Sequence, residues 1–260
     1  MLLAYEITGT GVPLVMLHAF PLSHAMWHDE RQTLSPLGRI ICPDLPGFGR
    51  SQQQVEPSIP AMASLLIDLL DQLSIREPIM LAGLSMGGYV ALEFFRQFPE
   101  RVLALGLFST RAGIDTPEAR ATRLKTAETI RREGLNAFAQ AMPQTLLGRT
   151  TLSSQPKLAQ AISQLIASNN PHGVADALLA MANRRDSTPI LASIMCPTLI
   201  LSGEEDVVIP PTESEELHRR IGGSSYQVIP AAGHLVNLEQ PKRFQEILGH
   251  FIRERVLAPS

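Results

Sequence analysis

The chain has 260 residues, of which 45% are hydrophobic and 18% charged, and its formal net charge is −3. This balance is typical of a folded globular domain and excludes a disordered, fibrous or coiled-coil chain. The charge offers no basic stripe for a phosphate backbone, so no nucleic-acid partner is expected.

Short apolar runs that alternate with helical patterns predict an α/β fold, with a mostly parallel sheet covered by helices on both faces. Each run is rich in branched aliphatic residues and is followed by turn-forming residues, as in strands buried on both sides. The expected buried strands are Val12–His18, Arg39–Pro43, Pro78–Gly83, Val102–Ser109, Thr198–Gly203 and Ser225–Pro230. An antiparallel edge strand is expected at Leu2–Thr8, before a turn at Gly9–Gly11.

Two segments have the apolar spacing of amphipathic helices that pack on the sheet. In the first, Ser58 is a candidate N-cap and Pro60 lies in the first turn. The two apolar stripes consist of Met62, Leu65, Leu66, Leu69, Leu70 and Leu73, and of Phe244, Ile247, Leu248, Phe251 and Ile252.

The region from Thr110 to Ser187 interrupts the alternation of strands and helices. Ten Lys or Arg and six Asp or Glu give it a net charge of +4. We expect a helical lid (110–187) inserted between two strands of a core formed by 1–109 and 188–260, covering the strand ends where open α/β sheets bind ligands. Its predicted helices are Ala119–Arg132, Leu135–Leu147, Lys157–Ser168 and Gly173–Arg184.

A candidate nucleophile, Ser85, lies within Gly83–Gly88 (GLSMGG). The pattern Gly-x-Ser-x-Gly is weak alone, but here an apolar strand precedes it and an apolar helix follows it. A serine in a sharp turn between the two exposes its hydroxyl, and the flanking glycines let strand and helix pack closely. The alternative is a tight turn in which Ser85 only caps the helix.

A serine hydroxyl becomes a nucleophile only with a general base and a group that orients this base. His234 is the best placed of the seven histidines, because it directly follows a glycine after the last predicted strand. The acid is expected between Ser85 and His234, where three consecutive carboxylates follow Gly203. Asp206 is preferred because the glycine turn should aim it at the site, and Glu205 is the alternative.

Together, these residues resemble the α/β-hydrolase superfamily over nearly the whole chain. Four landmarks occur in the family's order: His18–Pro21, Asp44–Ser51 (DLPGFGRS), the turn at Ser85, and the later Asp206 with His234. Within the superfamily, small bacterial esterases and lactonases related to 3-oxoadipate enol-lactonase are the most similar group. The segments that carry this similarity are Met26–Trp27, Gly83–Gly88 and Ala232–Leu235.

The resemblance implies a serine hydrolase that cleaves a small-molecule carboxylic ester or lactone. His234 would take the proton of Ser85, Asp206 would hold the imidazolium, and water would cleave the acyl-serine intermediate. A serine at this turn suits acyl transfer and excludes haloalkane dehalogenases and epoxide hydrolases, which use a carboxylate there.

The backbone N–H groups of Phe20 and Met86 are expected to form the oxyanion hole of this site. His18 and Asp44 are assigned to the structure of the loops beside the cavity. The sequence contains no cluster of metal ligands, and its glycine-rich turn lacks the lysine of a phosphate-binding loop. No cofactor and no metal are therefore expected.

Other functions remain open. A cofactor-free perhydrolase or a hydrolase of carbon–carbon bonds would use the same triad with a different pocket, and a ligand sensor or signalling partner would use the lid as its interaction surface. The basic lid would suit an anionic substrate, although the arginines of its first helix are expected to face water. These arginines are Arg120, Arg123, Arg131 and Arg132. Met142, Leu146 and Met181 either line an acyl pocket or belong to the core.

The remaining features concern the compartment of the protein. The two cysteines, Cys42 and Cys196, lie far apart, which disfavours a disulfide framework and a cysteine-based zinc site. The chain opens without a basic leader, and no apolar run approaches the roughly 20 residues of a membrane-spanning helix. We therefore expect a cytoplasmic protein that does not enter a membrane. The sequence predicts neither the particular ester or lactone nor the oligomeric state.

Overall fold

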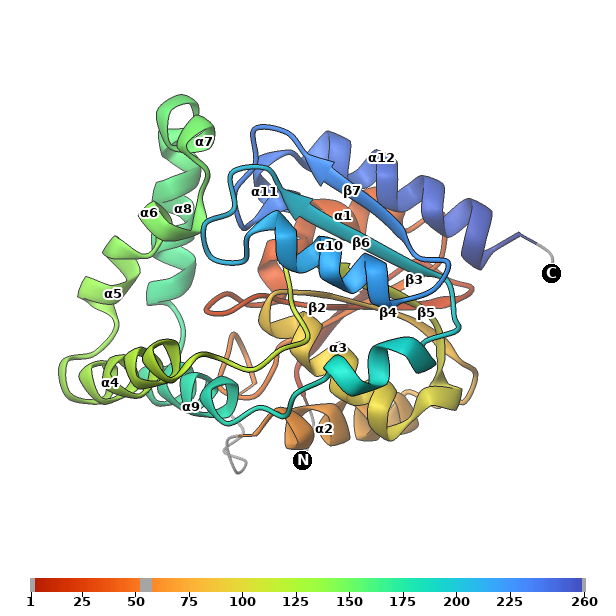
Figure 1. The fold of residues 1–260 in the computed structure, drawn as a ribbon, viewed down its shortest axis with the longest axis horizontal. Helices are drawn as coiled ribbons and strands as arrows, with labels where there is room; N and C mark the ends of the chain where they lie inside the picture. The colour runs from red at the N-terminus through yellow and green to blue at the C-terminus, as the bar shows by residue number, and fades with distance from the viewer. Residues whose placement is uncertain (1–2, 52–57, 259–260) are drawn as a thin grey trace.

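A seven-stranded sheet forms the centre of the computed structural model, which describes residues 3–51 and 58–258 (Figure 1). The strand order is β1-β3-β2-β4-β5-β6-β7, with β1 antiparallel to β3 and all other neighbours parallel. The strands are β1 (Tyr5–Thr8), β2 (Pro13–Leu17), β3 (Arg39–Pro43), β4 (Ile79–Leu84), β5 (Val102–Phe108), β6 (Thr198–Gly203) and β7 (Ser225–Ile229).

The predicted strands agree with these bounds closely. Each of β2–β7 begins and ends within one residue of its prediction, and the predicted antiparallel edge strand is β1. The first residue predicted for that strand, Leu2, lies outside the described residues. All strands except the antiparallel edge strand were expected to be buried on both faces, and this prediction is wrong for β7. Gln227 and Val228 are exposed there, because β7 forms the second edge of the sheet.

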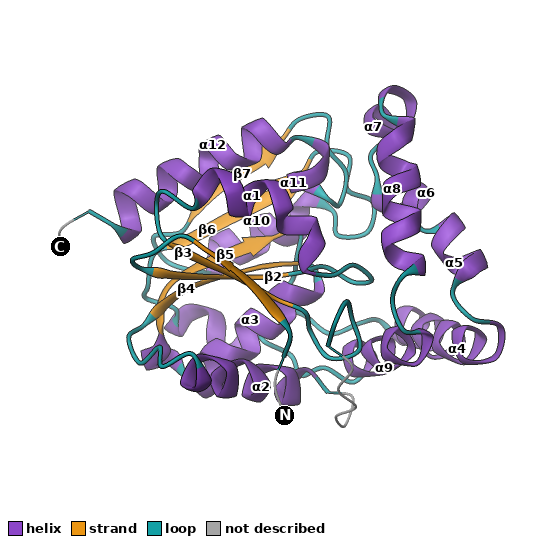
Figure 2. Cartoon of the chain, turned by 180° about the vertical axis from the view of Figure 1, so that it is seen from behind, coloured by secondary structure: helices purple, strands orange, loops and turns teal. Residues whose placement is uncertain are grey.

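Helices cover both faces of the sheet, as predicted (Figure 2). On one face lie α2 (Ile59–Gln72), α3 (Met86–Gln97) and α10 (Pro211–Arg220), and on the other lie α1 (His28–Leu34) and α12 (Pro241–Phe251). The short helical segments are η1 (His24–Trp27), η2 (Pro99–Arg101), η3 (Thr188–Ser193), α11 (Val236–Glu239) and η4 (Ile252–Val256).

The apolar stripes of α2 and α12 face the sheet, as their spacing predicts. Ser58 caps α2 by accepting a hydrogen bond from the N–H of Ala61 (3.2 Å). In the α2 stripe, Leu65 and Leu73 are only partly buried. The buried members of the two stripes are Met62, Leu66, Leu69, Leu70, Phe244, Ile247, Leu248, Phe251 and Ile252.

Between β5 and β6 the chain forms six consecutive helices, α4–α9, which we call the helical insertion (Figures 1 and 2). The single helix predicted at Leu135–Leu147 is wrong, because Pro143 has no N–H to continue it and the segment divides into two helices. Helix α7 was not predicted. The six helices are α4 (Pro117–Glu133), α5 (Asn136–Ala141), α6 (Pro143–Leu146), α7 (Arg149–Ser154), α8 (Pro156–Ala167) and α9 (Pro171–Ala182).

None of the described helices combines the length and the apolar character that crossing a membrane requires.

Candidate active site

Ser85 forms the turn between β4 and α3, at the carboxyl end of the sheet, with φ +55° and ψ −112°. A non-glycine residue rarely adopts a positive φ, and such a backbone persists only where its surroundings hold it. The N–H of Ser85 donates to the carbonyl of Phe108 (2.9 Å), and the hydroxyl of Thr110 donates to the carbonyl of Ser85 (2.9 Å). Both partners come from the end of β5, which therefore holds the turn in its strained conformation.

The glycines around Ser85 let β4 and α3 pack closely, as the sequence predicts, and they also let β2 approach α3. A Cβ on Gly83 would lie 2.2 Å from the carbonyl carbon of Gly87, and one on Gly87 would lie 2.4 Å from the carbonyl oxygen of Leu17. Any larger residue would push the helix away from the sheet. The side chain of Ser85 makes no capping hydrogen bond to α3, so the alternative in which it only caps the helix is wrong.

His234 and Asp206 form a buried hydrogen-bonded pair, with Nδ1 of the ring 2.8 Å from Oδ2 of the carboxylate. The other carboxylate oxygen, Oδ1, accepts hydrogen bonds from the N–H groups of Val208 and Ile209 (2.9 Å each). In the tautomer in which Nδ1 donates to this carboxylate, Nε2 is the acceptor nitrogen of the ring.

The two other carboxylates of this loop have different partners. Glu205 accepts hydrogen bonds from the N–H (2.9 Å) and the hydroxyl (2.6 Å) of Thr150, in the helical insertion. Glu204 accepts a hydrogen bond from the N–H of Ala231 (3.2 Å). Of the three candidates, Asp206 is the one that contacts His234.

The hydroxyl of Ser85 makes no hydrogen bond with any residue that the structure describes. The structure therefore joins Asp206 to His234 and places Ser85 at the same edge of the sheet, but it does not join Ser85 to His234. The three residues follow β4, β6 and β7, and the carboxyl ends of parallel strands lie at one edge of a sheet.

The N–H groups of Phe20 and Met86 donate no hydrogen bond within residues 3–51 and 58–258. Met86 begins α3, where the first N–H groups of a helix have no partner inside the helix. Phe20 lies in the loop after β2, next to Ala19, whose own N–H donates to Sδ of Met26 (3.2 Å). Two backbone donors at the carboxyl end of the sheet are thus available to a bound anion.

His18 and Asp44 fix the loops after β2 and β3, as the sequence predicts. Nε2 of His18 accepts a hydrogen bond from the N–H of Leu45 (2.9 Å), and burial lowers the pKa of His18 to about 4, which keeps the ring neutral. The carboxylate of Asp44 accepts from the N–H groups of His24 (2.8 Å) and Arg50 (2.9 Å). Burial favours the neutral form of Asp44, but the hydrogen bonds from His24 and Arg50 hold its pKa below the usual value.

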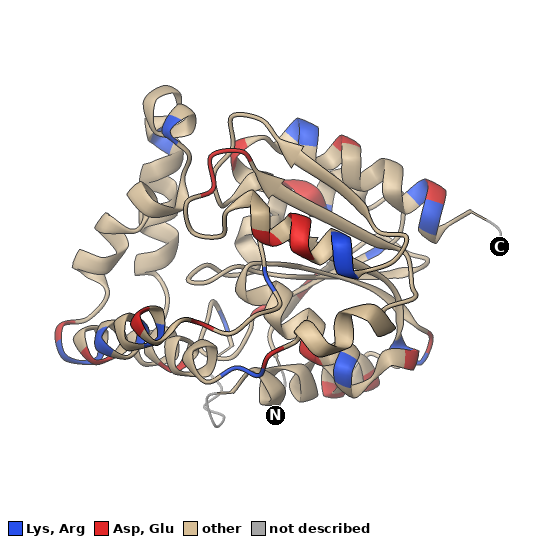
Figure 3. Cartoon of the chain, in the orientation of Figure 1, with Lys and Arg blue, Asp and Glu red and all other residues tan. Residues whose placement is uncertain are grey.

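The arginines of α4 all have partners, and basic and acidic residues are mixed along this helix (Figure 3). The prediction that they face water holds for three of them and is wrong for Arg123, which is partly buried because it bonds to Asp115 (2.7 Å). The other pairs are Arg120 with Asn183, Arg131 with Asp176 and Arg132 with Glu133. Of the candidate pocket residues, Leu146 and Met181 belong to the core and Met142 is partly buried.

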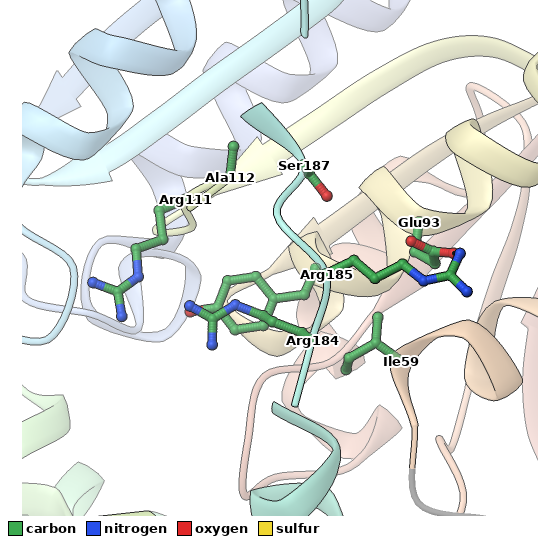
Figure 4. Close-up of a pocket in the computed structure, with 8 residues that line it drawn as sticks. Ile59, Glu93, Arg111, Ala112, Arg184, Arg185 and Ser187 are labelled. Carbon is green, nitrogen blue, oxygen red and sulfur yellow. The ribbon is translucent and has the colours of Figure 1, made fainter. Parts of the chain in front are cut away.

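A small pocket lies between α3 and the two ends of the helical insertion (Figure 4). The guanidinium of Arg184 lies 4.4 Å from the centre of the Tyr89 ring, and Arg185 reaches Glu93 (3.6 Å). The cavity volume is about 10 Å³, enough for a single water molecule, so this pocket is not a substrate site.

The described part of the chain contains no group of three or more His, Cys, Asp or Glu side chains that could hold a metal ion.

Sequence reasoning missed one buried acidic residue beside His234. Glu239 is 2% exposed and accepts hydrogen bonds from the N–H groups of Leu235 (3.0 Å) and Gly148 (2.8 Å). No local pattern distinguishes this glutamate from a surface carboxylate, because one of its partners is 91 residues away in the chain.

Comparisons with known proteins agree with this architecture. The chain is 34% identical to the putative 2-succinyl-6-hydroxy-2,4-cyclohexadiene-1-carboxylate synthase of Bacillus subtilis (strain 168), over 96% of this chain and 93% of that protein. It is 29% identical to 3-oxoadipate enol-lactonase 1 of Acinetobacter baylyi, over 96% and 93% of the two chains. Among solved structures, a thermophilic esterase from Thermogutta terrifontis with malate bound is 43% identical, with a TM-score of 0.94 and coverage of 97% and 93%.

The family model described as alpha/beta hydrolase fold matches residues 12–241. The protein is an enzyme of that family, and its similarity to an esterase and an enol-lactonase supports a hydrolase activity. The chain therefore belongs to the α/β-hydrolase fold family.

Proposed function

We propose that this protein is a serine hydrolase that cleaves a carboxylic ester or a lactone through an acyl-serine intermediate. The observation that carries the proposal is the buried hydrogen bond between His234 and Asp206 (2.8 Å), at the edge of the sheet where Ser85 occupies its strained turn. This set combines a base, the acid that orients it and a serine held in a strained turn, as acyl transfer requires.

In the proposed reaction, Nε2 of His234 takes the proton from Ser85 as Oγ attacks the carbonyl carbon of the substrate. Asp206 stabilises the imidazolium, and the N–H groups of Phe20 and Met86 stabilise the negative oxygen of the tetrahedral intermediate. The imidazolium then protonates the departing alkoxide, which leaves the acyl-serine. Water, activated by the same histidine, attacks the acyl-serine and frees the acid product.

The electrostatics of the pair support the role of Asp206. Its carboxylate accepts two backbone N–H groups besides the ring N–H, so its charge is held in place without a further cation. A fixed negative charge next to Nδ1 favours the imidazolium that forms in the transition state. Each oxyanion donor contributes about 3 kcal/mol to lowering the barrier in enzymes of this kind.

The free hydroxyl of Ser85 is compatible with this mechanism. In enzymes without substrate, catalytic hydrogen bonds are often long or poorly aligned, and they tighten when the substrate binds. We propose that substrate binding brings Ser85 Oγ into reach of His234 Nε2. We also propose that the helical insertion acts as a lid (110–187) over the core formed by 1–109 and 188–260.

A second candidate comes from the Bacillus subtilis relative, whose name describes the synthesis of a cyclohexadiene carboxylate. A product with carboxylate groups calls for cationic side chains that are free to bind it. Three of the four arginines of α4 are instead paired with the carboxylates of Asp115, Asp176 and Glu133, and the fourth, Arg120, donates to the amide of Asn183. This pairing favours a neutral ester or lactone over an anionic substrate.

The decisive test compares Ser85→Ala with Ser109→Ala on p-nitrophenyl acetate, p-nitrophenyl butyrate and a panel of lactones. Ser109 is a matched control, because it also has a positive φ (+42°) at the end of the neighbouring strand and its hydroxyl is buried. Ser85→Ala is expected to lower kcat by more than about 10³-fold, while Ser109→Ala remains active. Full activity in Ser85→Ala would contradict the proposal.

A further inference from the structure

Glu239 lies at the end of α11, one short helix after His234, and is almost completely buried. Its two carboxylate oxygens have separate partners. Oε1 accepts the N–H of Leu235, the residue that follows His234 (3.0 Å), and Oε2 accepts the N–H of Gly148, between α6 and α7 (2.8 Å). A carboxylate that accepts two backbone donors joins the segments that supply them.

The same part of the helical insertion holds His234 directly. The N–H of His234 donates to the carbonyl of Leu146 (2.9 Å). The two loops are in close contact, because a Cβ on Gly233 would lie 2.2 Å from the backbone nitrogen of Gly148. The backbone N–H groups of His234 and Leu235 are therefore both fixed by partners outside their own loop, one on the insertion and one on Glu239.

From this arrangement we propose that Glu239 is a positioning residue for His234, acting through the backbone of Leu235 and the turn at Gly148. The proposal rests on the proposed function, in which His234 is the general base. The imidazole can serve both Ser85 and Asp206 only if its backbone is held in one place, and its backbone has no regular secondary structure of its own. Without Glu239, two N–H groups in the interior would lose their acceptor, and the loop would shift to find others.

The test is Glu239→Gln, which keeps the size of the side chain but replaces one acceptor oxygen with an NH₂ group facing an N–H. Glu246→Gln on α12 is the control, because Glu246 is exposed and its carboxylate lies near Arg243 (3.7 Å) rather than near the N–H groups of Leu235 and Gly148. The active sites able to react are counted by titration with a p-nitrophenyl alkylphosphonate, and kcat is then expressed per titrated site. In that reaction Ser85 Oγ bonds to phosphorus, its proton goes to His234, and p-nitrophenolate leaves.

The expected result is a kcat per titrated site that falls about 10- to 100-fold in Glu239→Gln, since small misplacements of a catalytic group have effects of this size. KM should change by less than about twofold, because substrate contacts are untouched. The downfield proton resonance of His234 Nδ1–H should also shift or broaden in Glu239→Gln but not in Glu246→Gln. A residue that only stabilises the fold would lower the number of titrated sites and leave their kcat and this resonance unchanged.

A wild-type kcat per titrated site in Glu239→Gln would overturn the positioning role. Should that variant fail to fold, Glu239→Asp takes its place, because its shorter side chain keeps the charge but cannot reach both donors. Loss of kcat per titrated site would support the role, and a wild-type value would overturn it. Mass spectrometry of the wild-type protein separates the two proposals, since a phosphonate absent from Ser85 contradicts the proposed function itself.

Discussion

Glu205 and Asp206 are adjacent in the chain, yet their carboxylates bond to different parts of the molecule. Asp206 turns inward to His234 and to two backbone N–H groups, and its side chain is fully buried. Glu205 turns to Thr150 and Arg149 at the start of α7, where its hydrogen bonds hold its pKa below the usual value. The hydrogen-bond partners of the two carboxylates, rather than their residue types, thus distinguish the candidate catalytic acid from its neighbour.

This difference predicts unequal effects of two similar substitutions. Asp206→Asn removes the charge next to His234 and allows the wrong tautomer, so kcat should fall by about 10³- to 10⁴-fold. Glu205→Gln affects the contact with the insertion and should lower kcat by less than about tenfold. Steady-state kinetics on p-nitrophenyl butyrate measures both, and a larger loss in Glu205→Gln than in Asp206→Asn would reverse the assignment.

Residues that depend on local sequence could be predicted, and those that depend on distant contacts could not. Ser85 has a recognisable pattern because the glycines on both sides are needed for the close approach of strand and helix. Glu239 and Arg123 have no such pattern. Glu239 bonds to Gly148, which is 91 residues away in the chain, and Arg123 bonds to Asp115, which lies before its helix and too far from Arg123 for the helical spacing to reveal the contact.

Among the elements, α1, α11 and α12 meet around a buried carboxyl group, that of Glu30. Asn237 (3.3 Å) and Gln245 (3.2 Å) donate hydrogen bonds to it, one from α11 and one from α12. Burial raises the pKa of Glu30 to about 7, against the opposing effect of these two hydrogen bonds. The junction of the three helices therefore includes a carboxyl group that holds its proton at mildly acidic pH.

The raised pKa makes the stability of this junction dependent on pH. Because the folded protein holds the proton more tightly than the unfolded chain, the stabilisation is present at low pH and is lost as the pH rises through about 7. Between pH 5 and pH 8 the contribution of Glu30 to the free energy of unfolding should fall by about 2–3 kcal/mol. Urea unfolding of wild type and Glu30→Gln at both pH values tests this, and an equal pH dependence in the two proteins would contradict it.

Strands and helices could be predicted from the sequence where a single apolar pattern covers the segment. Strands β2–β6 are apolar runs between turn residues, and their predicted bounds hold because both faces are covered. Between α5 and α6 the apolar spacing continued through Pro143, so periodicity alone predicted one helix where the missing N–H makes two. Periodicity also gave no signal for α7, a helix of only six residues.

At the scale of the whole molecule, the order of the strands decides which loops meet. The order β4-β5-β6-β7 brings the loops of Ser85, Thr110, Asp206 and His234 side by side at the carboxyl edge. The sequence predicted a parallel sheet but not this order of strands, because the composition of an apolar run does not show which other strands it pairs with. The helical insertion then contacts the same edge: the carbonyl of Leu146 accepts from the N–H of His234, and the N–H of Thr150 donates to Glu205.

The central claim is that an acyl group is transferred to Ser85, and rapid acid quenching followed by mass spectrometry tests it most directly. Wild-type protein mixed with p-nitrophenyl butyrate and quenched within the first turnover is expected to carry one butyryl group on the peptide that contains Ser85. The Ser85→Ala protein should carry none. Hydrolysis at the wild-type rate with no butyryl group on that peptide, or the same modification in Ser85→Ala, would contradict the claim.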